Sequence, residues 1–215
     1  MRKIRGGRRG NRGRLSANKA GGRAEFESTL ERDFFMLLEF DEAVETFMPQ
    51  PVRIAYRAES GRATHYVPDA LVTYRDGRAP SLYEVKYQAE LQARAAEFRL
   101  KFQAAASYAA EQGWTFAAIT EHDIRTARLK NVAFLRAFLD PQRVFSEGTQ
   151  VDLLARLRAQ PGREATPASL LAGLSVEQRG AALPVLWHLI ARHRIGAELE
   201  QPLGMNSRLI SKAPS

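Results

Sequence analysis

The chain has 215 residues, of which 45% are hydrophobic, enough for one large packed domain or two small ones. It contains no cysteine, which excludes disulfides, thiolate zinc sites and cysteine nucleophiles. No apolar run is long enough to cross a membrane, and the N-terminus lacks the hydrophobic stretch of a secretion signal. We therefore expect a globular protein of the bacterial cytoplasm, associated with the nucleoid.

Positive charge is concentrated at the N-terminus. Residues 1–24 contain nine of the 32 Lys and Arg residues and no acid, which leaves 23 basic and 24 acidic residues elsewhere. This segment is rich in glycine and poor in apolar residues, so we expect a disordered arm. Such an arm could be a solubilising tail, but phosphate neutralisation on DNA is the favoured interpretation. The candidate DNA-binding residues are Arg5, Arg8, Arg9, Arg12 and Arg14.

The first regular element is an amphipathic helix over residues 26–40, with apolar residues at helical spacing. Glu31 lies at the border of its buried stripe. It either extends a carboxylate toward a neighbouring sheet or is an ordinary first-turn acid favoured by the helix dipole. A turn at Pro49-Gln50-Pro51 then precedes a short strand over residues 52–56.

Two strands follow, over residues 66–74 and 81–86, joined by a segment with the Asp-Gly signal of a hairpin turn. Pro68 cannot donate a ladder hydrogen bond, so it indicates a bulge or a sheet edge. Pairing of the two strands brings Asp69 beside Glu84.

A long helix over residues 89–111, a buried strand over 116–120 and a closing helix over 131–139 complete this part. The order of helix, three strands, helix, strand and helix predicts an α/β sandwich. Asp140-Pro141 marks the expected domain boundary, since a residue before proline is biased out of helical geometry.

The remaining chain has a different pattern. It predicts three helices followed by a small hairpin, which describes a winged-helix-like module over residues 145–215: helices at 151–159, 166–171 and 184–194, and short strands at 195–199 and 208–210. Such modules often bind DNA grooves. This one is not markedly basic, so docking to a partner protein is equally open.

The two-residue period of side chains along the strand at residues 81–86 indicates which reaction the candidate site could perform. Side-chain alternation puts Glu84 and Lys86 on one face of their strand and Tyr83 and Val85 on the other. The carboxylates of Asp69 and Glu84 suit a hard cation such as Mg²⁺. Lys86 could orient or deprotonate water, or neutralise charge developing on a phosphate. The pattern favours metal-dependent phosphodiester hydrolysis, although charged residues also alternate on solvated strands.

Motifs in a fixed order carry a family resemblance. Over residues 25–140 the chain resembles TnsA, the endonuclease subunit of heteromeric transposases, in the runs Leu30-Glu31-Arg32-Asp33-Phe34, Leu38-Glu39-Phe40-Asp41, Phe47-Met48-Pro49-Gln50-Pro51, Tyr66-Val67-Pro68-Asp69, Tyr83-Glu84-Val85-Lys86-Tyr87, Gly113-Trp114-Thr115-Phe116 and Ile124-Arg125.

The resemblance implies a restriction-endonuclease-like catalytic domain at residues 25–140, with a central mixed sheet flanked by helices, and a winged-helix-like C-terminal domain. It implies an enzyme that uses Mg²⁺, with Mn²⁺ able to substitute, and cuts the 5′ strand at transposon ends. An integrase-type transposase subunit, TnsB, would process the 3′ strand, and an AAA+ regulator, TnsC, is a further implied partner.

The site residues are carried over by motif. The catalytic residues implied are Glu31, Asp69, Glu84 and Lys86, and the implied metal ligands are Glu31, Asp69, Glu84 and Val85. The family also accepts glutamine at the position of Glu84, so the carboxylate here adds a charge to the metal site.

Two other functions fit the residues alone. One is a stand-alone restriction or repair nuclease of the same fold. The other is a non-catalytic adaptor that binds DNA or a transposase through a domain whose acids are merely solvated. Dependence of cleavage on Asp69 separates the enzymes from the adaptor, and dependence on a cognate transposase separates the two enzymes.

Overall fold

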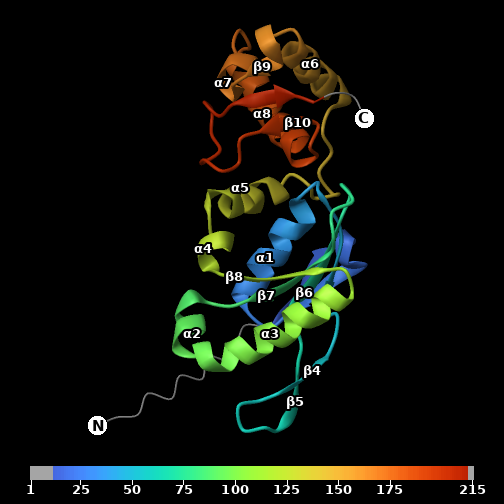
Figure 1. The fold of residues 1–215 in the computed structure, drawn as a ribbon. Coiled ribbons are helices and arrows are strands. Elements are labelled where there is room, and N and C mark those ends of the chain that lie inside the picture. The colour runs from blue at the N-terminus through green and yellow to red at the C-terminus, as the bar shows by residue number, and fades with distance from the viewer. Residues whose placement is uncertain (1–11, 213–215) are drawn as a thin grey trace, which may run out of the picture. The chain divides into compact units, whose positions relative to one another are not determined.

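The computed structural model describes residues 12–212, and the chain divides after Arg125 into two compact units (Figure 1). This division falls before the boundary expected at Asp140, because the helix that was expected to close the first domain belongs to the second unit. Among residues 12–212, no helix is long and apolar enough to cross a membrane.

The first unit mixes helices and strands. Its elements in chain order are β1 (Gly13–Ala17), η1 (Asn18–Ala20), β2 (Gly22–Phe26), α1 (Thr29–Phe40), β3 (Val44–Pro49), β4 (Ile54–Arg57), β5 (Ala63–Tyr66), β6 (Ala70–Tyr74), β7 (Ser81–Val85), α2 (Gln88–Ala93), α3 (Ala95–Glu111), β8 (Thr115–Ile119) and α4 (Glu121–Ile124).

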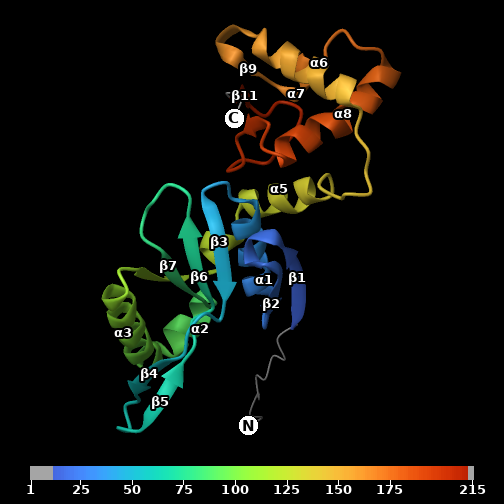
Figure 2. The same cartoon turned by 90° about the vertical axis from the view of Figure 1, so that its right-hand side faces the viewer.

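A mixed sheet forms the centre of this unit. Within the described residues its strand order is β3-β6-β7-β8, with the first two pairs antiparallel and β7-β8 parallel. Helices α1 and α3 cover opposite faces (Figure 2). Leu82 is buried with Ala105 of α3, whereas the ring of the next residue, Tyr83, lies 5.3 Å from that of Phe34 in α1. The predicted α/β fold with a central mixed sheet flanked by helices is confirmed.

The central hairpin forms as predicted. Strands β6 and β7 pair with Ala70 opposite Tyr83, and Gly77 in the connecting turn has a φ of 77°, in the left-handed region that favours glycine. The strand expected over residues 66–74 is instead interrupted. Strand β5 ends at Tyr66 and β6 begins at Ala70, because Pro68 between them lacks the N–H that a continuous ladder needs.

The interruption creates a second hairpin. Strand β5 pairs with β4 rather than with the central sheet, so β4 and β5 form a separate two-stranded ribbon beside α3 (Figures 1 and 2). The sequence predicted a strand over residues 52–56 but no partner for it.

The N-terminal segment differs from the expected disordered arm. Residues 13–26 form the hairpin β1-β2, in which Arg14 Nε donates to Glu25 Oε1 over 2.9 Å. The Glu39 carboxylate of α1 accepts hydrogen bonds from the backbone N–H groups of Asn18 and Lys19, which joins the hairpin to the core. Arg5, Arg8 and Arg9 lie outside the described residues.

The helix expected over residues 89–111 is divided in two. Arg94, with φ of −123° and ψ of 28°, separates α2 from α3. Its guanidinium binds Glu90 in α2 and Glu97 in α3, each at 2.7 Å, so the same residue links the two helices.

The second unit is mainly helical. Its elements are α5 (Ala127–Arg136), α6 (Glu147–Arg158), η2 (Pro161–Arg163), β9 (Glu164–Ala165), α7 (Pro167–Leu170), α8 (Val176–Ala191), β10 (Ile195–Ala197) and β11 (Leu209–Ser211). The strands form an antiparallel sheet in the order β10-β11-β9. The expected three helices and final hairpin are present, with β9 and α5 in addition, but α8 begins at Val176 and contains Pro184, which was expected to start it.

A buried asparagine explains why α5 belongs to this unit. The Asn131 amide nitrogen donates to the carbonyls of Leu199 and Gln201, both at 2.8 Å, and its amide oxygen accepts from the N–H of Leu203 at 2.9 Å. Buried polar groups need such partners, and here one side chain in α5 satisfies three backbone groups of the segment after β10.

We predict that Asn131→Ala destabilises the second unit by about 3 kcal/mol, because it removes three hydrogen bonds and leaves backbone groups unsatisfied. Urea denaturation followed by circular dichroism measures the change. The neighbouring exposed residue provides the control: Lys130→Ala should stay within about 0.5 kcal/mol of the parent protein. Equal stability of the two variants would contradict the role given to Asn131.

Candidate active site

The register of β6 and β7 brings Asp69 and Glu84 together. Asp69 immediately precedes β6, and its backbone N–H donates to the carbonyl of Tyr83 over 2.9 Å. Its Oδ2 atom in turn accepts the N–H of Val85 over 2.7 Å. Glu84 is buried, at 3% exposure. The pairing predicted from the hairpin is therefore present, and one hydrogen bond to the Asp69 backbone and one to its side chain hold this residue at the end of β7.

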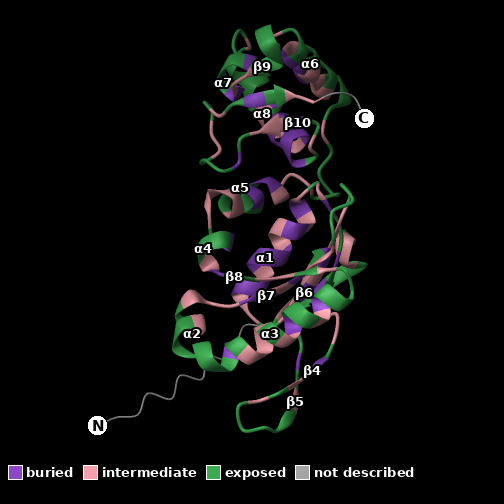
Figure 3. Cartoon of the chain, viewed as in Figure 1, coloured by how far each residue is buried: buried purple, intermediate pink, exposed green. Residues whose placement is uncertain are grey.

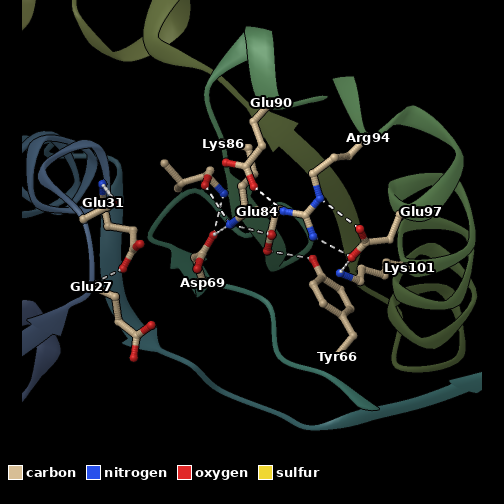
Figure 4. Close-up of polar contacts among 12 residues, drawn as sticks. Glu27, Glu31, Tyr66, Asp69, Glu84, Lys86, Glu90, Arg94, Glu97 and Lys101 are labelled. Atoms are coloured by element: carbon tan, nitrogen blue, oxygen red, sulfur yellow. Dashed lines mark hydrogen bonds and ion pairs between the residues drawn. The ribbon is translucent and has the colours of Figure 1, made fainter. Parts of the chain in front are cut away.

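Lys86 completes the cluster. Its Nζ atom lies 2.8 Å from Glu84 Oε1, 3.5 Å from Asp69 Oδ2 and 3.1 Å from the Val85 carbonyl oxygen. Figure 4 shows the three side chains pointing toward one another. The sequence placed Glu84 and Lys86 on one strand face, and the ion pair between them agrees with that placement.

Tyr66 is a member of the site that the sequence reasoning missed. Its hydroxyl donates to Glu84 Oε2 over 2.8 Å, so the two oxygens of this carboxylate are held by different residues, Tyr66 and Lys86 (Figure 4). The available signal was its position three residues before Asp69 in the Tyr-Val-Pro-Asp run. A buried tyrosine hydroxyl needs a partner, and a nearby carboxylate is a strong one.

Burial controls the electrostatics of the cluster. Burial and the Glu84 carboxylate raise the pKa of Asp69 to about 7, although Lys86 and the Val85 N–H act in the opposite direction. Burial lowers the pKa of Lys86, but Asp69 and Glu84 more than offset this and raise it. Burial, reinforced by Glu84, also raises the pKa of the Tyr66 hydroxyl. The site thus places the carboxyl groups of Asp69 and Glu84 close together, with the Lys86 ammonium as their positive partner.

Glu31 is not brought into the cluster. Ser28 caps α1 by accepting the Glu31 N–H, and the Glu31 Oε2 atom accepts the N–H of Glu27 over 2.8 Å. Glu31 is close enough to Asp69 and Lys86 for their charges to affect it, but burial is the main cause of its raised pKa. Among residues 12–212, no group of three or more acids or histidines is arranged to hold a metal ion.

The cluster nevertheless offers suitable donors for a divalent cation. Carboxylate oxygens of Asp69 and Glu84 and the carbonyl oxygen of Val85 all contact the Lys86 ammonium, which is itself a cation. Oxygen donors of these types are those that Mg²⁺ and Mn²⁺ prefer. The donor types at Asp69, Glu84 and Val85 therefore fit the implied metal, and the ligand roles of these residues and of Glu31 stay predictions.

Three other residues singled out from the sequence, Arg12, Arg14 and Gln50, lie beside the cluster of Asp69, Glu84 and Lys86. Arg12 and Arg14 line an open groove of about 540 Å³ together with Gln50, but their guanidinium groups pair with Glu27 and Glu25. Gln50 has a φ of 47°, which is unusual for a residue with a side chain, and its N–H donates to the Asp69 carbonyl. The turn containing Gln50 thus helps to hold the backbone of Asp69.

Comparison with known proteins shows which family the chain resembles. The family described as TnsA-like endonuclease N terminal matches residues 41–121, and the family described as TnsA endonuclease C terminal matches residues 123–199. Comparison with curated proteins gave no match. The first match includes Asp69, Glu84 and Lys86 but begins after Glu31, and the border between the two matches lies close to the division after Arg125.

The raised pKa of Asp69 has a consequence for stability. Because it is about 7 in the folded protein against an ordinary 3.8, the folded protein keeps a proton that the unfolded chain releases. The free energy of unfolding therefore falls as pH rises between these two values. We predict that Asp69→Asn, which cannot ionise, raises the melting temperature in EDTA at pH 8 by a few degrees.

Differential scanning calorimetry across this pH interval checks the prediction. Asp76→Asn, in the exposed turn between β6 and β7, is the control and should keep the pH dependence of the parent protein. A lower melting temperature for Asp69→Asn at pH 8 would mean that ionised Asp69 stabilises the fold.

Proposed function

Since the chain belongs to the TnsA endonuclease family, we propose that it is a metal-dependent nuclease that cuts the 5′ strand at each end of a transposon. The observation that carries the proposal is the convergence of Asp69, Glu84 and the Val85 carbonyl around one positive charge at the end of β7. That arrangement suits a divalent cation, which proteins usually hold through carboxylates together with the phosphate of the substrate.

The side chains have distinct roles in this proposal. Asp69 and Glu84, with the Val85 carbonyl, would hold Mg²⁺, and Mn²⁺ would substitute for it. The bound cation would supply a Lewis acid that stabilises charge on the reacting phosphate. Tyr66 keeps the Glu84 carboxylate in one orientation through its 2.8 Å hydrogen bond. Preorganised contacts of this kind avoid the cost of arranging the site during the reaction.

Lys86 acts on the phosphate rather than on the cation. An ammonium has donors but no lone pair, so it is not a metal ligand. Its Nζ atom lies in contact with both carboxylates, which favour its charged form. We therefore assign it to neutralising the negative charge that develops on the phosphate, in preference to deprotonating the attacking water.

The proposal includes partners. An integrase-type transposase, TnsB, would cut and join the 3′ strand, and the AAA+ protein TnsC would regulate the assembly in the bacterial cytoplasm. The family match supports a subunit of a transposition complex that acts on DNA. A winged-helix-like role for the second unit, on DNA or on a partner protein, belongs to the same proposal. A stand-alone nuclease would need no such partner. An adaptor would need no catalytic cluster.

We predict that Asp69→Ala and Glu84→Ala each lose cation binding and lower strand cleavage by roughly 100-fold or more. Lys86→Ala should lower cleavage similarly but keep cation binding, since it removes a positive charge and no ligand. The assay combines labelled transposon-end duplex, Mg²⁺ and the cognate transposase, with both strands resolved by denaturing electrophoresis. Mn²⁺ calorimetry measures cation binding separately.

Asp76→Ala, an acid in the exposed turn of the same hairpin, is the matched control and should cleave at the parent rate. Full cleavage by Asp69→Ala would support the adaptor function, with cleavage performed by the transposase. Cleavage of arbitrary DNA without the transposase would support a stand-alone nuclease. Equal loss of cation binding in all three cluster variants would contradict the role given to Lys86.

A further inference from the structure

The β4-β5 ribbon has two different faces. Its inner face contributes Ile54 and Tyr66 to a buried cluster with Leu82 of β7 and Ala105 of α3. Its outer face is exposed, and the tip of the ribbon is exposed on both strands (Figure 3). The inner contacts therefore fix the ribbon on the first unit, while the outer face stays available to a partner.

Strand pairing determines which residues share the outer face. Ala55 lies opposite His65, and Arg57 lies opposite Ala63. Residues directly opposite each other in an antiparallel pair point to the same side. Arg53, just before β4, belongs to this face as well, since its guanidinium lies 3.4 Å from the His65 ring nitrogen Nδ1. The outer face thus alternates arginine and alanine along β4.

The charge of this face is not balanced by acids. The segment from Arg53 to His65 contains three arginines and one acid, Glu59. Within the described part of the chain, none of these three arginines is paired with a carboxylate; Arg57 instead donates to the Gly61 carbonyl in the turn. By contrast, the carboxylates of Glu90 and Glu97 neutralise Arg94 between α2 and α3.

The shape of the face suits a phosphate backbone. Arginine presents a planar fork of donors that matches phosphate oxygens, and the small side chain of Ala55 between two arginines lets a bulky partner approach the strand. Arg53 and Arg57 are four residues apart, which is about 13 Å along an extended strand. Four successive phosphate steps in one DNA strand advance by a similar distance along the helix axis.

The ribbon is also connected to the catalytic cluster. Its last residue, Tyr66, donates to Glu84, and three residues further on the chain reaches Asp69. A duplex whose phosphate lies at this cluster would therefore pass close to the base of the ribbon.

We propose that the outer face of the β4-β5 ribbon, formed by Arg53, Ala55, Arg57, Ala63 and His65 with Arg62 at the turn, binds the phosphate backbone of duplex DNA beside the cleaved phosphate. The proposal rests on the proposed nuclease function and adds to it a positioning surface. Contacts of this kind fix the register of the duplex on the protein without reading its sequence.

The first test measures equilibrium binding of the full chain to a fluorescent duplex in EDTA, where the metal-dependent reaction is absent, over a range of salt concentrations. The double variant Arg53→Ala/Arg57→Ala should bind roughly tenfold more weakly at 0.1 M salt, and the slope of log affinity against log salt should fall by about 2. The loss should be the same for unrelated duplex sequences. Arg99→Ala, an exposed arginine on α3, is the control and should leave affinity and slope unchanged.

The second test uses the absence of cysteine from the chain. A single Ala55→Cys substitution, in the middle of the outer face, should form a disulfide with a duplex that carries a thiol tether on a phosphate near the cleavage position. The matched control, Ala106→Cys on the exposed side of α3, should not cross-link at the same protein and DNA concentrations.

Each outcome separates this proposal from the nuclease function. Unchanged affinity and slope in the arginine double variant, or equal cross-linking from both cysteines, would overturn the DNA-binding role of the ribbon even if cleavage depends on Asp69. Weakened binding and selective cross-linking from the ribbon would support it even if no cleavage were observed.

Discussion

Two carboxylates held side by side in a largely buried position require a positive charge between them, and this constraint organises the first unit. Burial raises the pKa of Asp69 to about 7, and the Lys86 ammonium lies in contact with both Asp69 and Glu84. Proteins seldom bury like charges together unless a partner compensates their desolvation. A divalent cation compensates two carboxylates more fully than one ammonium does, so the donors of this cluster suit such a cation.

The surrounding fold makes the arrangement rigid. The β6-β7 register sets the two acids opposite each other, the Val85 N–H fixes one oxygen of Asp69, and the Tyr66 hydroxyl fixes one oxygen of Glu84. Helices α1 and α3 cover the two faces of the sheet, so the strands that carry these groups cannot shift independently. The ribbon that supplies Tyr66 is held by the same core cluster as Leu82. The contacts that stabilise the sheet thus also position the side chains of the candidate site.

The local patterns predicted the centre of the first unit well. Strand alternation at residues 81–86 and the Asp-Gly turn were sufficient for the Asp69-Glu84 pair, because register and side-chain period are short-range properties. The features that depended on distant partners were missed. The strand containing Tyr66 pairs with β4 instead of continuing through Pro68, and Asn131 joins α5 to a segment some seventy residues away, which moves the boundary to Arg125. Glu31 lies on α1 as expected, but helix periodicity could not tell whether its carboxylate reaches the cluster or stays with the N–H of Glu27.

Our proposal assigns Asp69, Glu84 and Val85 to the cation site of a nuclease. Its most direct test is a crystal structure of the protein with Mn²⁺ and a duplex, in which anomalous scattering locates the ion. We predict one Mn²⁺ bound by the Asp69 and Glu84 carboxylates and the Val85 carbonyl, with the Lys86 ammonium moved away from that point toward the phosphate. Mn²⁺ bound elsewhere, with Lys86 still between the two carboxylates, would contradict it.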